Sequence, residues 1–296
     1  MPLRRGLDTF LNYLTRDRDE RPYTLISNIG SGAFATVWSC HHKEMNRAAK
    51  IIDTDRLTKA DQKLLKNEIQ IWSELDHENT VQMYDVYQEP ARCVIICELL
   101  KGGTLRERHK RMIRLGTKPR ILTILNGIEQ IAHGMTYIHS KGFIHRDIKS
   151  ENILLTGDHE TYKIADYGLA RTVDGAEKTA ETGSYRHMAP EVIRHEVYAS
   201  PCDVYSFAIL LYEMLTLSEP FYQYTPVDAA LAVATRGERP PLPPLPEQGL
   251  TQLIESCWSQ CASSRPSFPE ILARVQTLKL KKNSFGSLQM SRLPIV

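Results

Sequence analysis

The sequence lacks the features that mark membrane, secreted and zinc-binding proteins. Its 296 residues contain no apolar run close to the roughly 18 residues that a membrane-spanning helix needs. The first residues, Met1 to Arg5, lead into no continuous apolar segment, so we expect no secretory signal. The six cysteines are scattered and form no C-x-x-C pair, which disfavours a zinc site or a disulfide framework. We therefore expect a cytoplasmic protein without a transmembrane segment.

Net charge is also small. The chain has 37 Lys and Arg residues against 35 Asp and Glu residues, a formal charge of +2 at pH 7, which argues against a general nucleic-acid-binding protein. The charge is unevenly distributed. Residues 1–23 carry +1 and residues 279–296 carry +4, which leaves −3 for residues 24–278. We therefore expect an acidic body followed by a basic C-terminal tail, and the tail has no strong periodicity that would predict regular structure.

The order of apolar runs predicts a β-rich part followed by a helical part. Within the first hundred residues, strands are predicted at 23–29, 35–40, 47–52, 81–87 and 93–97. Helical spacing predicts one helix over 57–75. Beyond them, helices are predicted at 121–138, 204–217, 250–258 and 269–278, with short strands at 153–155 and 162–165. A short amphipathic stretch within residues 1–22 predicts a flanking helix and linker.

Two features of the β-rich part suit phosphate binding. Gly30 and Gly32 lie between two predicted strands, where glycine lets backbone N–H groups approach a phosphate, although an ordinary hairpin turn uses the same residues. Lys50 ends a predicted strand and by itself resembles a surface lysine. Glu68, however, lies on the apolar face of the predicted helix, one turn from Trp72, where a carboxylate needs a partner. We expect Lys50 to be that partner.

The most informative segment runs from His145 to Asn152. It brings a carboxylate, an amine and an amide together in Asp147, Lys149 and Asn152, between a long helix and a strand. Such groups can accept a hydroxyl proton, neutralise a phosphoryl group and supply an oxygen ligand to Mg²⁺. Asp166 follows 14 residues after Asn152, within Asp-Tyr-Gly, and is a candidate second Mg²⁺ ligand. For each residue taken alone, a polar turn with capping side chains is the simpler interpretation.

In this order, these segments resemble the protein kinase signature, together with Ala189-Pro190-Glu191, Asp203 before an apolar helix, and Arg265. The resemblance covers residues 23–278 and implies an α+β, bilobal protein kinase fold. The implied domains are a flank at 1–22, a kinase domain at 23–278 and a basic tail at 279–296. Within the kinase domain, the small β-rich N-lobe with one helix covers about 23–98, and the larger helical C-lobe covers about 102–278.

The resemblance also implies roles for individual residues. Lys50 contacts phosphates and pairs with Glu68, Asp147 deprotonates the substrate hydroxyl, and Lys149 stabilises the transferred group. Asn152 and Asp166 hold Mg²⁺. The implied ATP-binding residues are Ile29, Gly30, Ser31, Gly32, Ala33, Phe34, Ala35, Val37, Ala48, Lys50, Cys97, Glu98, Leu100, Leu154 and Asp166. In this set Ile29, Val37, Ala48 and Leu154 contact adenine, Cys97 is the gatekeeper, and Glu98 and Leu100 bind through their backbone. Glu191 and Arg265 form a buried pair, and Asp203 braces the catalytic loop.

The subgroup is indicated by a few further residues. Lys149 is typical of serine/threonine kinases, and the segments 203–207, 257–258 and 265–268 resemble the tyrosine-kinase-like group. Residues 179–188 and 229–241 are similar to Raf-like MAP kinase kinase kinases. The chain departs from the pattern at Ala35 (third glycine), Tyr167 (Phe), Ser184 (Thr) and His187 (Trp). None of these changes removes a residue that the chemistry requires, and a buried Tyr167 hydroxyl would need a partner.

The expected activity is therefore transfer of the γ-phosphoryl group of ATP, with Mg²⁺, to Ser/Thr hydroxyls of a protein substrate in signalling. The alternative is a weakly active or inactive kinase-fold scaffold. The resemblance also implies that Arg146 pairs with a phosphorylated residue of the segment 166–191. The candidate residues are Thr172, Thr179, Thr182, Ser184 and Tyr185, and Thr179 or Thr182 is favoured.

Three charged or proline-rich segments suggest contacts with partners. Residues 239–246 contain P-x-x-P spacings that suit an SH3-type partner, although a rigid loop between two helices is the simpler interpretation. Residues 106–120 hold seven Lys and Arg residues against Glu107 alone. Such a run is usually a solvated helix face, but it can also bind an acidic substrate or partner. The basic tail is a candidate contact with a membrane surface or a partner.

Overall fold

A computed structural model describes residues 22–32, 35–172, 184–244 and 248–290, with side chains up to residue 282. The chain divides into two compact units, residues 1–101 and residues 102–296. In the described ranges, each helix is too short or too polar to cross a membrane. The helix predicted within residues 1–22 lies outside the described residues.

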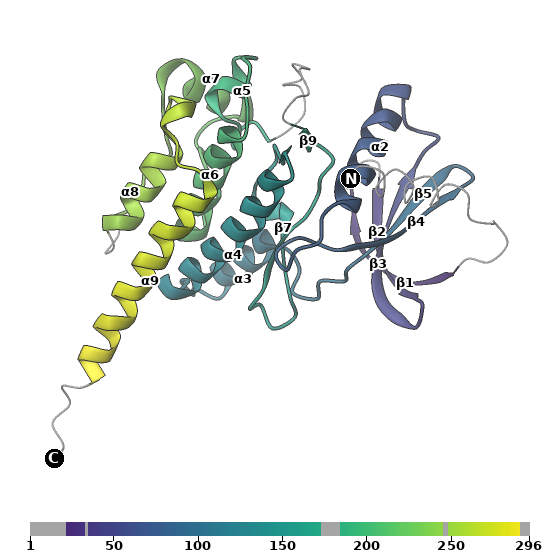
Figure 1. Cartoon of the computed structure of the whole chain (residues 1–296), viewed down its shortest axis with the longest axis horizontal. Coiled ribbons are helices and arrows are strands. Elements are labelled where there is room, and N and C mark those ends of the chain that lie inside the picture. Colours follow the sequence, from purple (N-terminus) through teal and green to yellow (C-terminus); the bar gives the residue numbers. More distant parts are fainter. Residues whose placement is uncertain (1–21, 33–34, 173–183, 245–247, 291–296) are drawn as a thin grey trace. The chain divides into compact units, whose positions relative to one another are not determined.

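The first unit is an antiparallel sheet with one helix, as predicted (Figure 1). Its strand order is β1-β2-β3-β5-β4. The strands are β1 (Tyr23–Ser31), β2 (Ala35–His42), β3 (Met45–Asp53), β4 (Met83–Glu89) and β5 (Arg92–Cys97). The short turns between consecutive strands favour this antiparallel arrangement, and helix α2 (Lys59–Ser73) connects β3 to β4.

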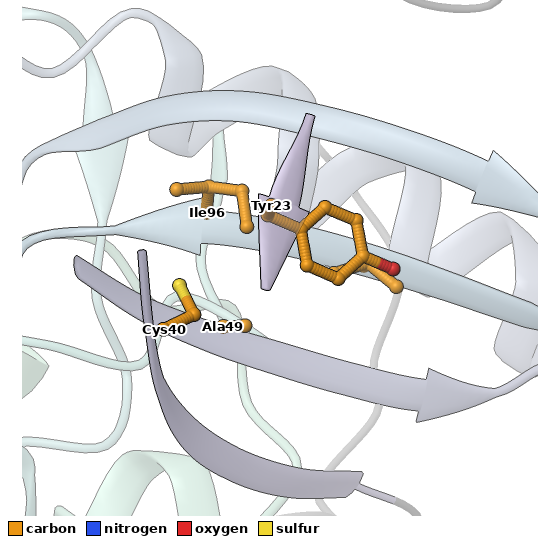
Figure 2. Packing of buried hydrophobic residues seen from close by; sticks show 5 residues of the cluster. Tyr23, Cys40, Ala49 and Ile96 are labelled. Atoms are coloured by element: carbon orange, nitrogen blue, oxygen red, sulfur yellow. The ribbon is translucent and has the colours of Figure 1, made fainter. Parts of the chain in front are cut away.

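One face of this sheet carries a small apolar core, shown in Figure 2. Ala49 on β3 lies opposite Ile96 on β5, and both side chains are fully buried with Cys40 of β2. Tyr23 covers them from β1, and its ring lies 5.5 Å from that of Tyr87 on β4. Because neighbouring side chains of a strand point to opposite faces, this core fixes which residues of β3 face the other way.

Helix α2 begins at a capping box and buries one face. The Thr58 hydroxyl accepts the Asp61 backbone N–H, and the Asp61 carboxylate accepts the Thr58 N–H at 3.0 Å. The buried residues of the helix are Glu68, Ile69, Ile71 and Trp72. A carboxylate therefore lies among apolar side chains, as the spacing of the sequence predicts.

The second unit is mainly helical. Its helices are α3 (Leu105–Arg114), α4 (Ile121–Ser140), α5 (Pro190–Ile193), α6 (Pro201–Thr216), α7 (Pro226–Arg236), α8 (Gln248–Cys257) and α9 (Phe268–Met290). Its short strands are β6 (Phe143–Ile144), β7 (Ile153–Leu155), β8 (Tyr162–Ile164) and β9 (Arg171–Thr172), where β6 pairs with β9 and β7 with β8. Helix α6 is buried along nearly its whole length, because it is apolar on all sides. Helix α9 packs along α4 (Figure 1).

The C-terminal region departs from prediction. Regular structure was expected to end at Leu278, but α9 continues to Met290. Lys279, the first basic residue of the predicted tail, forms an ion pair with Glu129 of α4. The first residue of the basic segment is therefore part of α9. Its charge is neutralised by a carboxylate of α4, which lies outside the tail.

Candidate functional site

The predicted site residues fall into two sets, one in each unit. In the first unit, Lys50 lies on β3 between Val37 of β2 and Ile95 of β5. Its Nζ lies 2.6 Å from Oε1 of Glu68. The Glu68 side chain is 9% exposed and that of Lys50 is 22% exposed. The ion pair therefore explains how α2 buries a carboxylate, and it holds an amine at a fixed position on the sheet.

The glycine loop joins β1 to β2. Gly30 lies opposite Val37 in the strand pair, Ser31 lies opposite Thr36, and the Gly32 N–H donates to the carbonyl of Ala35 at 2.8 Å. Neither Gly30 nor Gly32 has a positive φ, and an added Cβ on either would meet its neighbours only at ordinary contact distance. Neither glycine is therefore required by a strained backbone conformation or by a close contact in the loop. Ala33 and Phe34 lie outside the described residues.

The end of β5 contributes the next predicted contacts. Cys97 lies opposite Ala48, and both side chains are buried. Burial raises the pKa of the Cys97 thiol to about 12. The Glu98 N–H donates to the carbonyl of Gln82 at 2.9 Å, so a backbone contact from Glu98 to a base would use its carbonyl. Leu100 follows, half-buried, and Ile29 on β1 is exposed.

In the second unit, Asp147 lies in the loop that joins β6 to β7. Its Oδ2 accepts hydrogen bonds from Nζ of Lys149 at 2.6 Å and from Nδ2 of Asn152 at 2.8 Å. Nδ2 of Asn152 also donates to the Asp147 carbonyl at 2.8 Å. Oδ1 of Asp147 is buried and has no hydrogen-bond partner among the described residues. One carboxylate oxygen is thus held in place while the other remains available as a proton acceptor.

The fully buried Asp203 of α6 fixes the backbone of this loop. Its Oδ1 accepts the Arg146 backbone N–H at 2.7 Å, and its Oδ2 accepts the His145 backbone N–H at 2.9 Å. His139 of α4 adds a contact from Nε2 to Oδ2 at 2.8 Å. Burial alone would raise the pKa of Asp203, but the hydrogen bonds from His139 and the Arg146 N–H, with the electrostatic influence of His139 and His145, together hold the pKa below its usual value. The expectation that Asp203 braces the loop is confirmed.

His145 connects Asp147 to the segment that carries Asp166. The Asp147 N–H donates to Nδ1 of His145 at 3.3 Å, so the ring proton is on Nε2, which donates to the carbonyl of Ala165 at 3.1 Å. The Tyr167 ring lies 5.4 Å from the His145 ring, and its hydroxyl donates to the carbonyl of Ile164 at 2.8 Å. The buried Tyr167 hydroxyl therefore has the partner that it needs.

Asn152 is joined to the segment that carries Asp166, since the Ala165 N–H donates to the Asn152 carbonyl at 2.9 Å. Both hydrogen bonds of the Asn152 side chain use its nitrogen, which leaves the amide oxygen for a cation. Asp166 is exposed, with a left-handed backbone at φ 65°. Amide and carboxylate oxygens are the donors that Mg²⁺ prefers, so the chemistry of these two residues fits that ion.

Leu154 is placed by the close approach of two backbones. The Gly102 N–H donates to the carbonyl of Leu155, and the Leu155 N–H donates to the carbonyl of Gly103, both at 2.9 Å. A Cβ on Gly102 would lie 2.2 Å from the carbonyl oxygen of Thr156, so this position requires glycine. Leu154, between these contacts on β7, is half-buried.

The predicted buried pair of the second unit is present. Nη1 and Nη2 of Arg265 lie 2.6 Å and 2.7 Å from the two carboxylate oxygens of Glu191. The pair is bidentate and almost inaccessible to solvent. It joins α5 to the chain that precedes α9, and so fixes the end of the segment that begins at Asp166.

Sequence reasoning missed the environment of Glu213. This carboxylate lies on the apolar helix α6 and is 1% exposed. Its Oε2 accepts the Ser150 N–H at 3.2 Å and lies 3.3 Å from Nε2 of His187. Burial alone would raise the pKa of Glu213, but the neighbouring histidines His187 and His109 and the hydrogen bond from Ser150 together hold it below the usual value. His187, one of the noted departures, thus occupies a buried contact beside the loop of Asp147.

The segment that carries the candidate phosphorylation sites is described only at its ends. Thr172 ends β9, and Ser184 and Tyr185 begin the next described stretch. Thr179 and Thr182 lie outside the described residues. Arg146 has a left-handed backbone at φ 72°, and its Nη1 donates to the carbonyl of Leu169 at 3.2 Å.

Arg239 of the proline-rich segment is engaged within its own unit. Its Nε donates to the carbonyl of Trp258 and its Nη2 to Oε1 of Gln260, each at 2.8 Å. Its guanidinium also lies 5.0 Å from the centre of the Tyr205 ring. These contacts favour the interpretation of this segment as a loop between α7 and α8. An SH3-type partner remains a prediction.

Comparison with known proteins identifies the family. Residues 23–275 match the model of the protein kinase domain. The chain is 37% identical over 253 residues to serine/threonine/tyrosine-protein kinase HT1 of Arabidopsis thaliana, covering 83% of this chain and 64% of that protein. It is 32% identical over 264 residues to serine/threonine-protein kinase STY17 of the same plant, covering 88% and 45%. Mitogen-activated protein kinase kinase kinase 10 of Xenopus laevis is 32% identical over 279 residues, covering 88% and 27%.

The chain thus spans less than two thirds of the length of each of these relatives. One of them is named as a serine/threonine kinase, one as a serine/threonine/tyrosine kinase and the third as a MAP kinase kinase kinase, in agreement with the predicted subgroup. The match of the family model over most of the chain confirms the resemblance drawn from the motifs. This chain belongs to the protein kinase family.

Proposed function

We propose that the chain is an ATP-dependent protein serine/threonine kinase, which transfers the γ-phosphoryl group of ATP to Ser/Thr hydroxyls of a protein substrate. The observation that carries this proposal is the arrangement of Asp147. One of its oxygens is fixed by Lys149 and Asn152, and the other is buried without a hydrogen-bond partner among the described residues. Such a carboxylate can accept the proton of a hydroxyl at a defined atom.

Lys149 and Lys50 supply positive charge where phosphoryl transfer develops negative charge. Phosphoryl transfer needs positioning and charge neutralisation more than covalent chemistry. The Nζ of Lys149 is held beside Asp147, so it can stabilise the transferred group while Asp147 Oδ1 takes the hydroxyl proton. Lys50, fixed by Glu68, can bind the α- and β-phosphates from the first unit.

The adenine contacts and the Mg²⁺ ligands belong to the same proposal. Asn152 and Asp166 would hold Mg²⁺ through their side-chain oxygens. When bound, this ion neutralises charge on the phosphates. The base would lie against Ile29, Val37, Ala48 and Leu154, with Cys97 as gatekeeper and backbone contacts from Glu98 and Leu100.

We also propose that the protein acts in the cytoplasm. All six cysteines belong to the described residues and all are free thiols, five of them buried. Free thiols without a disulfide framework are usual in a reducing compartment.

The test is phosphoryl transfer by the purified chain from radiolabelled ATP to itself and to a general acceptor such as casein. Asp147→Asn removes the proton acceptor, and Lys50→Met removes the phosphate-binding amine. Each is expected to lower the initial rate by about two to four orders of magnitude. Phosphoamino-acid analysis should find label on Ser and Thr.

Matched controls are available within each unit. Lys63→Met on the exposed face of α2 and Asp158→Asn in the exposed turn before β8 make the same chemical changes away from the site. Both controls should retain the wild-type rate. Absence of transfer by the wild-type chain with ATP and Mg²⁺, while it is folded by circular dichroism, would favour the inactive scaffold. Label confined to Tyr would refute the serine/threonine assignment.

A further inference from the structure

A cavity of about 480 Å³ opens beside α3 in the second unit. Three arginines of this helix line it, namely Arg108, Arg111 and Arg114. On the far side it is lined by His159, in the turn between β7 and β8. None of these residues belongs to the set that the kinase mechanism uses, so the cavity needs an explanation of its own.

The charge of these arginines is not neutralised within the described part of the chain. Nη1 of Arg108 donates to the hydroxyl of Tyr162 at 3.0 Å and to the carbonyl of His159 at 3.3 Å, and both acceptors are uncharged. Arg111 and Arg114 form no ion pair with a described residue. These two side chains are exposed, whereas Arg108 is half-buried and held in position by its two bonds.

Arg106, on the same helix, differs from these arginines because its charge is neutralised by nearby carboxylates. It lies within 3.6–3.9 Å of the carboxylates of Glu151, Glu213 and Glu219. The only acidic residue among those lining the cavity is Glu107, and its carboxylate accepts the backbone N–H of Thr104 at 2.8 Å as part of the helix cap. The cavity therefore presents a local excess of positive charge on a body that carries −3 over residues 24–278.

Apolar side chains alternate with the arginines along this face. Met112 and Leu115 line the cavity, and they follow Arg108 at the i+4 and i+7 positions, on the same side of the helix. Leu115 is 64% exposed. A ligand that fills the cavity must therefore carry negative charge and also cover apolar surface. Free phosphate meets the first requirement only.

We propose that this cavity is a docking site for an acidic linear segment of a protein partner, in which carboxylate and apolar residues alternate along one face of the extended peptide, two residues apart. The three arginines extend over about 9 Å of the helix axis at about 1.5 Å per residue. An extended peptide covers that length with about three residues. Successive side chains of an extended peptide point to opposite faces, so residues two apart share a face. Acidic side chains on that face can reach the guanidinium groups, whose planar fork matches a carboxylate, and an apolar side chain two residues from them contacts Met112 and Leu115.

Charge complementarity selects this occupant over others. The C-terminal segment of the chain itself, residues 279–296, carries +4 and would be repelled by the arginines. A membrane surface contacts flat or convex faces, whereas this site is a recess that accepts individual side chains. Binding here is independent of phosphoryl transfer and can be measured without ATP, so its test does not depend on the proposed function.

The test is fluorescence polarisation with the purified full chain and a labelled peptide of three Glu-Ser-Leu-Ser repeats, in which Glu and Leu share one face of the extended chain. We expect saturable binding that weakens as salt is added. The double variant Arg111→Glu, Arg114→Glu should weaken binding at least about tenfold, because two charge-assisted contacts become repulsive. Replacing every Leu of the peptide by Ser should weaken it as well, because the apolar contacts are lost.

The matched control is Lys110→Glu, Lys118→Glu, which makes the same change of net charge at exposed positions that do not line the cavity. It should bind within about twofold of the wild type. Both double variants should retain wild-type melting temperature and casein phosphorylation. The proposal is overturned by no saturable binding, by equal losses in the two double variants, or by a chain that binds anionic vesicles or single-stranded DNA through Arg111 and Arg114 and not the peptide.

Discussion

Breaking the Glu191–Arg265 pair should destabilise the second unit far more than breaking an exposed pair of similar geometry. The side chains of Arg265 and Glu191 are 0% and 7% exposed. Arg265→Met removes one partner and leaves the carboxylate of Glu191 buried without its counter-charge. Loss of one member of a buried ion pair costs about 3–5 kcal/mol, because the remaining charge has been taken out of water without compensation.

The exposed comparison is Arg194 with Glu196. Its two N···O contacts, at 2.6 Å and 2.9 Å, nearly match those of the buried pair, but the side chains are 35% and 50% exposed. Arg194→Met should therefore cost about 0–1 kcal/mol, since both groups can return to water. The two substitutions thus make the same chemical change at nearly equal ion-pair distances. They differ in burial and in backbone contacts, since Arg265 also donates to the carbonyls of Ser259 and Pro201, whereas Arg194 also donates to that of Ala234.

Thermal unfolding followed by circular dichroism measures the difference. A unit of roughly 150–250 residues loses about 2–4 °C of melting temperature per kcal/mol, so Arg265→Met should lower it by about 6–20 °C and Arg194→Met by less than about 4 °C. The double substitution Glu191→Leu, Arg265→Met should recover part of the loss, because no buried charge remains. Equal shifts for the two single variants would refute the reasoning that burial decides the cost.

Two further predictions concern titratable groups. Burial lowers the pKa of His109 to about 4 from its usual 6.5, so the unfolded chain binds more protons between these values. This contribution to stability is complete above about pH 6.5 and is lost as the pH falls towards 4, by about 3 kcal/mol. Urea unfolding across this range should show a shallower pH dependence for His109→Leu, and an unchanged dependence would contradict the assignment. Hydrogen bonds from Ser263 and Ser264 lower the pKa of the exposed Cys261 thiol, whereas burial raises that of Cys97 to about 12. Iodoacetamide at neutral pH should therefore alkylate Cys261 first, as followed by peptide mass spectrometry, with the urea-unfolded chain as the control; faster modification of Cys97 would be the contrary result.

The Lys50–Glu68 pair illustrates what sequence alone can predict. A lone carboxylate on an apolar helix face requires a partner, and Lys50 is the cation that the sequence offers for Glu68. The same argument applies to Glu213 within the apolar helix predicted at 204–217, whose partner the sequence reasoning missed. No local signal points to His187 as its neighbour, because the two residues are 26 positions apart and are brought together by tertiary packing.

Helix boundaries likewise divide into those that local sequence signals indicate and those that they do not. Helix α7 was not predicted, although Thr225 caps it, Pro226 begins it and Gly237 ends it in the left-handed conformation. Those signals are local and were available. The continuation of α9 beyond Leu278 was missed because the apolar periodicity ends there. The partners of Asp203 lie 57 to 64 residues away in sequence, so only the family resemblance suggested its bracing role.

The position of Asp203 has a consequence for how the protein moves. The amide protons of His145 and Arg146 are bonded to a carboxylate inside α6, the most deeply buried helix, rather than to a neighbouring loop. Solvent can reach these two amides only when α6 itself separates from the loop. Their exchange with deuterium should therefore be as slow as that of the helical core, although they lie in a segment without regular structure. The loop that carries Asp147, the proposed proton acceptor, would then open only together with the interior of its unit.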